Sequence, residues 1–154
     1  PFSEWQIRNI HQLILKNIDD DNAGRYRQQN VLISGATTMP PDYTLLNDKM
    51  AHLVDWYNSA AHTFHPIERA AKVHADFVGI HPFIDGNGRT SRLLMNLELM
   101  KAGYPPCVIT VENRLAYYEA LDQWMAYGIT EPFIQLVTDA VLEGFKPYQV
   151  VLGI

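Results

Sequence analysis

Residues 81 to 92, HPFIDGNGRTSR, bring together residue types that can act on a phosphate. Gly86 and Gly88 let the backbone turn so that successive N–H groups point outward. Such a turn at the start of a helix forms an anion-binding site. Arg89 and Arg92 follow at a spacing of three, so they should lie on roughly one face of that helix. Guanidinium groups suit phosphate oxygens, and two of them indicate a ligand with more than one phosphate.

Three more residues of this segment fit the same ligand. Asn87 adds a side-chain amide donor to the turn. Asp85 adds a carboxylate, which makes sense among phosphates mainly when Mg²⁺ lies between them. His81 could take a proton from an incoming nucleophile.

Each of these residues also has a plain structural interpretation. His81 could be an ordinary histidine before a proline, Asp85 a helix cap, and the Gly-Asn-Gly sequence a simple turn. Taken together, these interpretations leave unexplained why two cations, a carboxylate and an anion-binding turn converge in an acidic chain. We therefore favour a ligand site.

The composition excludes several function classes. The chain has 154 residues, 47% of them hydrophobic and 19% charged, which is typical of one soluble globular domain spanning 1–154. With a net charge of -5, the chain lacks the basic surface that a sequence-independent nucleic-acid binder needs. No apolar run approaches the roughly 18 residues that suggest a membrane span. We therefore expect neither nucleic acid nor a membrane as partner.

The cysteine count and the first residue give weaker indications. Cys107 is the single cysteine, so the chain cannot form an internal disulfide. The lack of disulfides is typical of proteins in a reducing compartment. Without a targeting segment, this favours a cytoplasmic location. Because the chain begins at Pro1 with no methionine, we expect it to be a piece of a longer protein.

Helical periodicity dominates the elements that must position the site. The pattern predicts an all-α domain whose helices cover about 3–18, a stretch beginning near Asp42, a stretch beginning near Pro66, 87–101, 111–126 and 131–145. One short β-hairpin is expected near 31–41, where Val31 and Ile33 alternate with their neighbours and Gly35 could form the turn.

The segment from 81 to 92 resembles the motif of the Fic family (filamentation induced by cAMP), H-x-F-x-[D/E]-G-N-G-R-x-x-R, at every fixed position. GRYRQQNVLISG through MPP resembles the hairpin that the family uses as a flap. HPIERAAKVH and RLLMNLELMKAGYPP resemble the helices beside the motif. The similarity covers essentially the whole chain and is closest to the animal-type and related bacterial branch. It implies a Fic-type helical domain.

The resemblance also implies an activity, which is AMP transfer from ATP to a Ser, Thr or Tyr hydroxyl of a target protein with release of pyrophosphate. His81 would be the base, and Asp85 would bind Mg²⁺ between the α- and β-phosphates. Asn87 and the backbone of residues 86–88 would hold those phosphates. Arg89 would assist, and Arg92 would bind the γ-phosphate.

Other site residues follow from the same resemblance. Ile33, Ser34 and Gly35 belong to the flap, which would clamp the target by pairing with an extended segment; an ordinary surface hairpin is the alternative. Tyr118 is expected to line the adenine pocket, with Tyr117 as the alternative. Met125 stands where animal relatives carry an amide, seven residues after Tyr118.

Regulation is expected to come from outside this chain. Many family members carry an inhibitory motif, [S/T]-x-x-x-E-[G/N], whose glutamate pairs with the arginine at the place of Arg92. Glu143-Gly144 comes nearest, but Asp139 stands where Ser or Thr is needed. We expect a separate inhibitory segment or an antitoxin-like protein to supply the restraint. A homodimer is a further expectation, because relatives often dimerise.

Other functions and other histidines stay as alternatives. AMP removal, transfer of another nucleotide or of phosphate, and a regulatory domain that binds nucleotide without turnover could all use the same site. A metal site at His62 and His65 is disfavoured because no third ligand is placed to help. His74 is expected to be a buried hydrogen-bonding residue, and His11 and His52 structural or surface residues.

Overall fold

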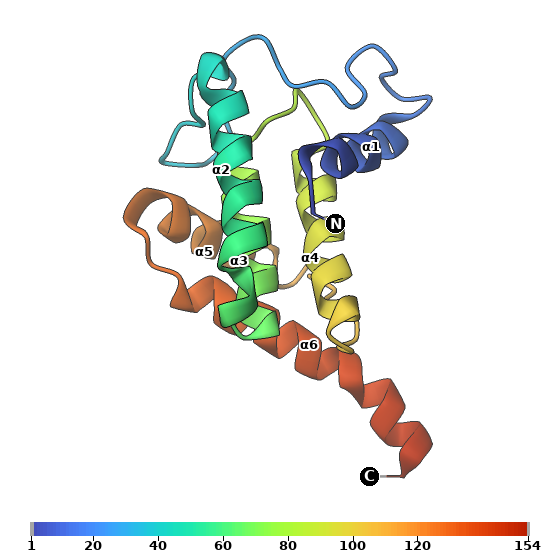
Figure 1. Cartoon of the computed structure of the whole chain (residues 1–154). Helices are drawn as coiled ribbons and strands as arrows, with labels where there is room; N and C mark the ends of the chain where they lie inside the picture. Colours follow the sequence, from blue (N-terminus) through green and yellow to red (C-terminus); the bar gives the residue numbers. More distant parts are fainter. Residues whose placement is uncertain (1, 154) are drawn as a thin grey trace.

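The computed structural model describes residues 2–153, which form an all-α domain (Figure 1). The all-α prediction is confirmed. The helices are α1 (Glu4–Leu15), α2 (Leu46–Ser59), α3 (Pro66–Ile80), α4 (Asn87–Lys101), α5 (Arg114–Tyr127) and α6 (Glu131–Leu152), with short 3₁₀ turns at Tyr43–Leu45 and Ala61–Thr63. Within the described residues, no helix has the length and apolar character that a membrane crossing requires.

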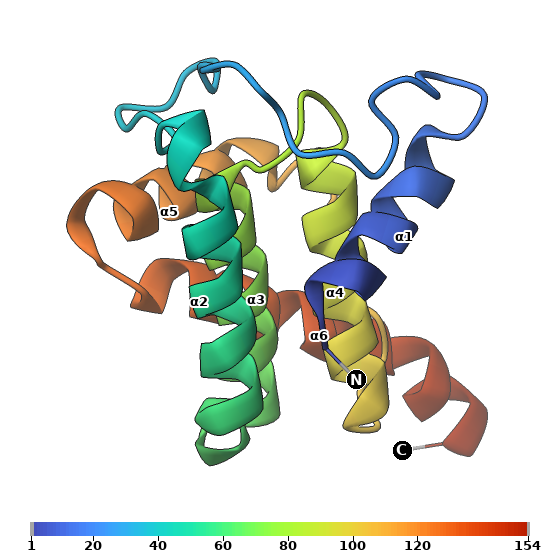
Figure 2. The same ribbon diagram turned by 45° about the horizontal axis from the view of Figure 1, so that its top comes forward.

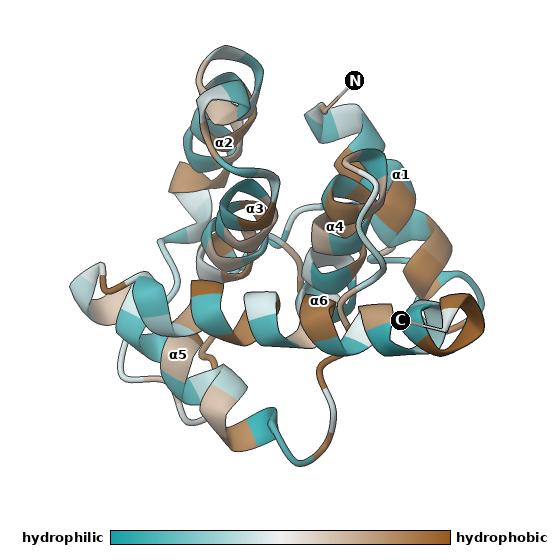
Figure 3. Ribbon diagram, turned by 90° about the horizontal axis from the view of Figure 1, so that it is seen from below, coloured by the Kyte–Doolittle hydropathy of each residue, from teal (hydrophilic) through white to brown (hydrophobic). Residues whose placement is uncertain are grey.

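Helix α3 forms the centre of the domain. It contacts α2, α4, α5 and α6, and Figure 2 shows it between α2 and the rest of the molecule. One side of α3 packs Val73 and Phe77 against α1, α2 and α4. The other side packs Ala71 and Ala75 against α5 and α6, and Figure 3 shows α6 crossing beneath α3 and α4. Because α3 is packed on both sides, its C-terminal end is held firmly in place.

The helix ends explain how well the boundaries were predicted. Helix α4 has the predicted bounds, since Gly86 precedes it and Gly103, with φ +83°, follows it. Helix α1 ends at Leu15 and not near Ile18, because the chain leaves helical geometry at Lys16. Asp42 caps the short 3₁₀ turn before α2 and not α2 itself.

The last two helices differ more from the prediction. Helix α5 begins at Arg114, three residues later than expected, since the residues before it form tight turns. Helix α6 continues seven residues beyond 145 and passes through Pro147. Its C-terminal turns extend away from the body of the domain (Figure 1). The helix continues on both sides of Pro147, although a proline inside a helix removes one hydrogen bond and crowds the preceding turn.

The expected β-hairpin is wrong in detail. Residues 31–41 form no strand; they belong to a loop of residues 28–42, here called the flap loop, which lies across one end of the helices (Figure 2). The turn exists, with Ala36 N donating to Ile33 O at 3.2 Å. After the turn, Thr37 bonds to Asp122 on α5 and not to a partner strand. Two prolines follow, and they have no N–H group for a β-ladder.

Candidate active site

The end of α3 fixes the backbone of His81. The His81 N–H donates to Phe77 O, after which the chain turns into the left-handed region at φ 52° and ψ 56°. A non-glycine residue in that region carries strain of about 1–3 kcal/mol and needs support from its surroundings. Part of that support comes from Arg27, whose Nε donates to the His81 carbonyl oxygen at 2.8 Å.

The imidazole of His81 is arranged to accept a proton. Its Nδ1 lies 3.1 Å from the Val78 carbonyl oxygen, which can only accept, so Nδ1 carries the proton of the neutral ring. Nε2 is then the free acceptor. Burial lowers the pKa of His81, the Val78 hydrogen bond opposes this, the charge of Arg27 lowers it further and that of Asp85 raises it. The ring is therefore neutral near pH 7.

The turn between His81 and α4 presents main-chain N–H groups. Gly86 has φ +79°, and a Cβ there would lie 3.1 Å from Nε2 of His11, so only glycine fits. The Gly86 N–H bonds to its neighbour Asp85 at Oδ1. The N–H groups of residues 87–89 have no acceptor within the part of the chain that the structure describes. They lie at the N-terminus of α4, where partial positive charge favours an anion.

The side chain of Asn87 is used inside the loop. Its Nδ2 donates to Phe83 O at 2.8 Å, and its Oδ1 accepts from Phe83 N at 2.9 Å. The residue is only 2% exposed. Asn87 thus closes the loop with its amide, and what it can offer a phosphate in this structure is its main-chain N–H.

His11 is a positioning residue that the sequence analysis did not assign to the site. Its ring stacks on Phe83 with centroids 3.5 Å apart, and Phe83 is fully buried, as expected of a core anchor. Nδ1 accepts from Gly24 N, so Nε2 carries the proton and donates to Asp85 O at 2.8 Å. Ile7, His11 and Leu15 recur every four residues, and this spacing could have placed His11 on the buried face.

The charged side chains lie around the mouth of the turn. Asp85 is exposed and pairs through Oδ2 with Arg89 Nη2 at 3.0 Å. Arg92 is also exposed, and its Nη1 would be 3.4 Å from a Cβ on Gly88, so its guanidinium lies against the turn. The predicted set from Asp85 to Arg92 is therefore gathered at the start of α4.

Behind the turn lies a buried polar group centred on His74. Its Nε2 is 3.0 Å from the Tyr117 hydroxyl and 3.2 Å from Ser91 Oγ. Burial lowers the pKa of His74 to about 3, and burial raises the pKa of Tyr117 to about 12 while Arg92 opposes that rise. Both groups are thus neutral. The prediction that His74 is a buried hydrogen-bonding residue is confirmed.

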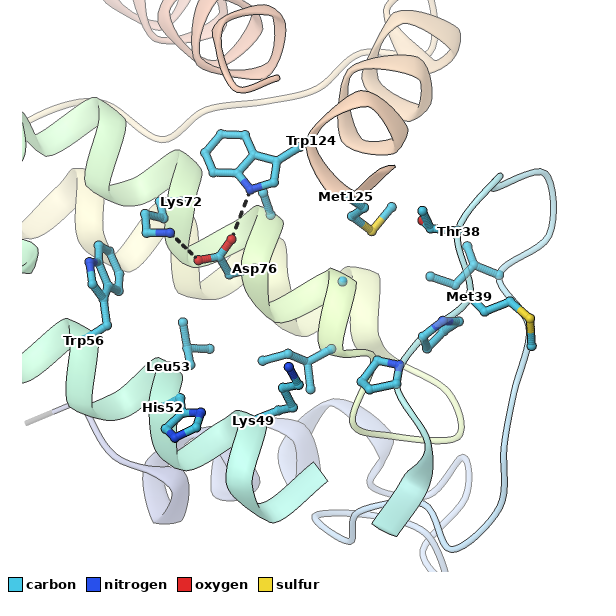
Figure 4. A pocket seen from close by; sticks show the side chains of 16 residues that line it. Thr38, Met39, Lys49, His52, Leu53, Trp56, Lys72, Asp76, Trp124 and Met125 are labelled. Carbon is cyan, nitrogen blue, oxygen red and sulfur yellow. Dashed lines mark hydrogen bonds and ion pairs between the residues drawn. The ribbon is translucent and has the colours of Figure 1, made fainter. Parts of the chain in front are cut away.

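The residues predicted for the flap and for the adenine pocket line two different cavities. Ile33 lies in the flap-loop turn and lines a cavity of about 680 Å³ with Gly79 and Met125 (Figure 4). Tyr118 is 52% exposed and lines a second cavity of about 300 Å³, whereas Tyr117 is buried. Both tyrosines line this cavity, and Tyr118 has by far the more exposed side chain.

Polar contacts also shape the larger cavity. In Figure 4, Asp76 accepts from Lys72 Nζ at 2.7 Å and from Trp124 Nε1 at 3.0 Å. Lys72 also lies over the ring of Trp56, 4.9 Å from its centroid. The lysine charge is therefore already matched, and Ile33 and Met125 add apolar side chains to the lining of this cavity.

Comparisons with known proteins identify the family of this chain. Residues 1–99 match the model of the Fic/DOC family. The protein adenylyltransferase Fic of Aedes aegypti is 43% identical over 134 residues, covering 86% of this chain and 26% of that protein. The chain therefore spans about a quarter of the length of such curated relatives.

Solved structures give the same result. Fic-1 from Caenorhabditis elegans superposes with a TM-score of 0.87 at 37% identity, covering 99% of this chain and 44% of that one. A Fic-domain signalling protein from Bacteroides thetaiotaomicron gives a TM-score of 0.84 at 31% identity, over 95% of this chain and 61% of that one. From its motif, its fold and these relatives, the chain belongs to the Fic/DOC family.

Proposed function

We propose that this chain transfers AMP from ATP to a hydroxyl group of a target protein. The observation that carries the proposal is the neutral His81, whose Nε2 is free to accept a proton and which directly precedes a turn with three available main-chain N–H groups. Relatives about 40% identical that are named protein adenylyltransferases support it.

The chemistry follows from this arrangement. Nε2 of His81 accepts the proton of the target hydroxyl as that oxygen attacks the α-phosphorus. The bond from the α-phosphorus to its bridging oxygen breaks, and the electron pair leaves with pyrophosphate. The N–H groups of the turn, with Arg89 and Arg92, neutralise the phosphate oxygens. Such reactions depend mainly on alignment and charge stabilisation.

The residues present fit a magnesium ion held mostly by the nucleotide. Within residues 2–153, no group of three or more His, Cys, Asp or Glu side chains could hold a metal. Asp85 offers one exposed carboxylate at the phosphate site. Mg²⁺ at nucleotide sites commonly takes one or two carboxylates together with phosphates and waters. Asp85 would hold the ion, which when bound would neutralise phosphate charge.

The flap loop would receive the target protein. Ile33 is half-buried, whereas Ser34 and Gly35 are exposed at the turn, so main chain there is accessible. An extended target segment could pair with it and bring a hydroxyl towards His81. Tyr118 would contact the nucleotide through its exposed ring.

Arg92 supports the proposal that inhibition comes from outside these residues. Within the described part of the chain, Arg92 forms no ion pair. Glu143, the glutamate nearest to the inhibitory pattern, pairs with Lys146 on α6. A glutamate from another segment or an antitoxin-like protein could therefore occupy Arg92 and compete with the γ-phosphate.

Labelled ATP tests the activity. The chain is incubated with Mg²⁺, cell extract and ATP labelled at the α- or the γ-phosphate. We expect α-label and no γ-label on protein, and no label with His81→Ala. Label only from the γ-phosphate would indicate phosphate transfer. No label from either, with ATP still bound, would favour a regulatory nucleotide-binding domain.

A further inference from the structure

A buried histidine behind the phosphate turn takes no part in the transfer chemistry described so far. His74 lies on α3, and its side chain is fully buried. Its ring packs against Tyr117 at a centroid distance of 5.6 Å and against Phe133 at 5.0 Å. In such surroundings a leucine or a phenylalanine would pack without burying polar atoms. The presence of two ring nitrogens there calls for an explanation.

The two ring nitrogens of His74 differ in their contacts. Nδ1 is buried and has no hydrogen-bond partner among residues 2–153. A buried polar atom in this state carries a desolvation penalty, so the ring does not lie here for the sake of stability alone. Nε2 lies 3.0 Å from the Tyr117 hydroxyl on α5 and 3.2 Å from Ser91 Oγ on α4. The polar contacts of the ring therefore pass through Nε2 to two hydroxyl groups.

Each of these hydroxyl groups also contacts the phosphate site. Ser91 Oγ donates to Gly88 O at 3.0 Å, in the turn itself. Burial raises the pKa of Tyr117, and the charge of Arg92 and a hydrogen bond from Arg92 oppose that rise. Because a guanidinium has only donors, the Tyr117 oxygen accepts this bond, and its own proton is free to bond to Nε2 of His74. A chain of contacts thus leads from α3 through α5 to the mouth of the turn.

Arg92 is a long side chain in an exposed position. Within the part of the chain that the structure describes, it forms no ion pair. A side chain without a fixed partner loses rotational freedom when it binds a ligand, and this loss weakens binding. A hydroxyl group held at a fixed place beside the guanidinium reduces that loss beforehand. The Tyr117 hydroxyl can do this because Nε2 of His74 holds it.

We propose that His74 is a positioning residue for nucleotide binding, whose Nε2 fixes the Arg92 guanidinium through the Tyr117 hydroxyl before the nucleotide binds. The proposal rests on the proposed function and adds to it a residue that touches neither the nucleotide nor the target. The ring acts as a neutral group. Burial and the charge of Arg92 lower the pKa of His74 to about 3, so at neutral pH it does not repel the guanidinium.

Nucleotide binding tests this role without a target protein. Calorimetry with Mg²⁺ compares ATP with AMP, which lacks the outer phosphates, for the parent chain, His74→Leu and Tyr117→Phe. The control is His62→Leu, which makes the same change at an exposed histidine. His74→Leu and Tyr117→Phe should each weaken ATP binding about threefold to tenfold and leave AMP binding unchanged. His74→Gln should restore part of the affinity, because its amide can bond to the Tyr117 hydroxyl.

Two further measurements separate positioning from a structural role. If His74 acts through Arg92, His74→Leu should not weaken ATP binding further in a chain that already carries Arg92→Ala. Urea unfolding should find His74→Leu at least as stable as the parent chain, because the change removes the unpartnered Nδ1. A purely structural role would instead lower the urea midpoint and weaken binding of ATP and AMP alike.

The outcomes also separate this role from the transfer activity. If no protein is labelled from ATP but ATP binding depends on His74 in this way, the proposed function fails and the positioning role stands. If labelling occurs and both His74→Leu and Tyr117→Phe bind ATP as tightly as His62→Leu does, the role is wrong and the function stands. Equal weakening of ATP and AMP binding, or a parent chain that does not bind ATP, would also overturn the role. Should His74→Leu fail to fold, Tyr117→Phe and His74→Gln must show the selective loss of ATP binding and its partial rescue.

Discussion

The loop from 81 to 92 and the flap loop are both irregular, but they are held in opposite ways. The first is stabilised by buried contacts of its own, with Asn87 closing on Phe83 and Thr90 donating to Gly86 O. The second is held mainly by exposed bonds, such as Thr37 to Asp122. This difference separates a fixed centre for chemistry from an adaptable surface for recognition.

One side chain connects the two loops. Arg27 is 3% exposed, and its guanidinium donates to the carbonyl oxygens of His81, Gln29 and Pro41. Its main-chain N–H also donates to Pro82 O. The ends of the flap loop are thus anchored to the backbone of the proposed base, while its tip is bonded to α5.

The largest expected effect is at the fixed loop. His81→Ala removes the acceptor for the hydroxyl proton and should lower the transfer rate by about 10² to 10⁴, with ATP binding retained. Single-turnover labelling measures the rate, and calorimetry the binding. A variant that labels as fast as the parent would show that the fixed loop does not supply the base.

A pair of asparagines compares the two loops most directly. Asn87→Ala removes two buried hydrogen bonds and leaves both polar groups of Phe83 without partners, so it should cost about 2 to 4 kcal/mol of unfolding free energy. Asn30→Ala removes two bonds on the exposed flap loop, to Asp42 and from Tyr43, and should cost at most about 1 kcal/mol. Urea unfolding measures both. Equal costs would contradict the contrast.

The link at Arg27 should appear in the pH profile of transfer. The pKa of His81 is already below its usual 6.5, and Arg27 contributes to this. Arg27→Gln removes that charge, so the His81 pKa rises and activity is lost at a higher pH as the medium is acidified. Arg27→Lys keeps the charge but not all three bonds. It should slow transfer with a smaller shift of the profile, and identical profiles for the two variants would argue against the charge effect.

The smallest effect is expected at the tip of the flap loop. Asp122→Asn weakens the two bonds from Thr37 by removing the carboxylate charge. Hydrogen exchange of residues 36–38 should become faster, while the urea midpoint stays close to that of the parent. If exchange does not change, these bonds do not hold the tip.

The parts predicted from sequence were those set by local patterns. The bounds of α4 and the gathering of Asp85 to Arg92 at its start depend on adjacent residues in the chain. His11 and Arg27 act on the loop from 74 and 54 positions away, and no local pattern reports such contacts. The sequence analysis assigned the side-chain amide of Asn87 to phosphate. In the structure this amide bonds to the backbone of Phe83, and residue types alone do not indicate such a backbone partner.

In the flap loop, by contrast, a local pattern led to a wrong prediction. Alternating residues near Val31 predicted strands, but strands need a partner. Thr37 instead donates to the carboxylate of Asp122 on α5. Pro40 and Pro41 have no N–H group that could donate to a partner strand. The pattern therefore predicted the turn at Ile33 correctly and the pairing wrongly.

The way His11 is bonded makes the site sensitive to acid. Its Nδ1 must stay unprotonated, because the Gly24 N–H donates to it, and burial lowers the pKa of this imidazole. The folded chain then takes up its proton less readily than the unfolded chain does. The contribution of His11 to stability is complete above pH of about 6.5 and is lost as the pH falls from there towards the lower folded value. Protonation of Nδ1 would break the bond from Gly24, so mild acidification should weaken the support that His11 gives to the phosphate turn through Asp85.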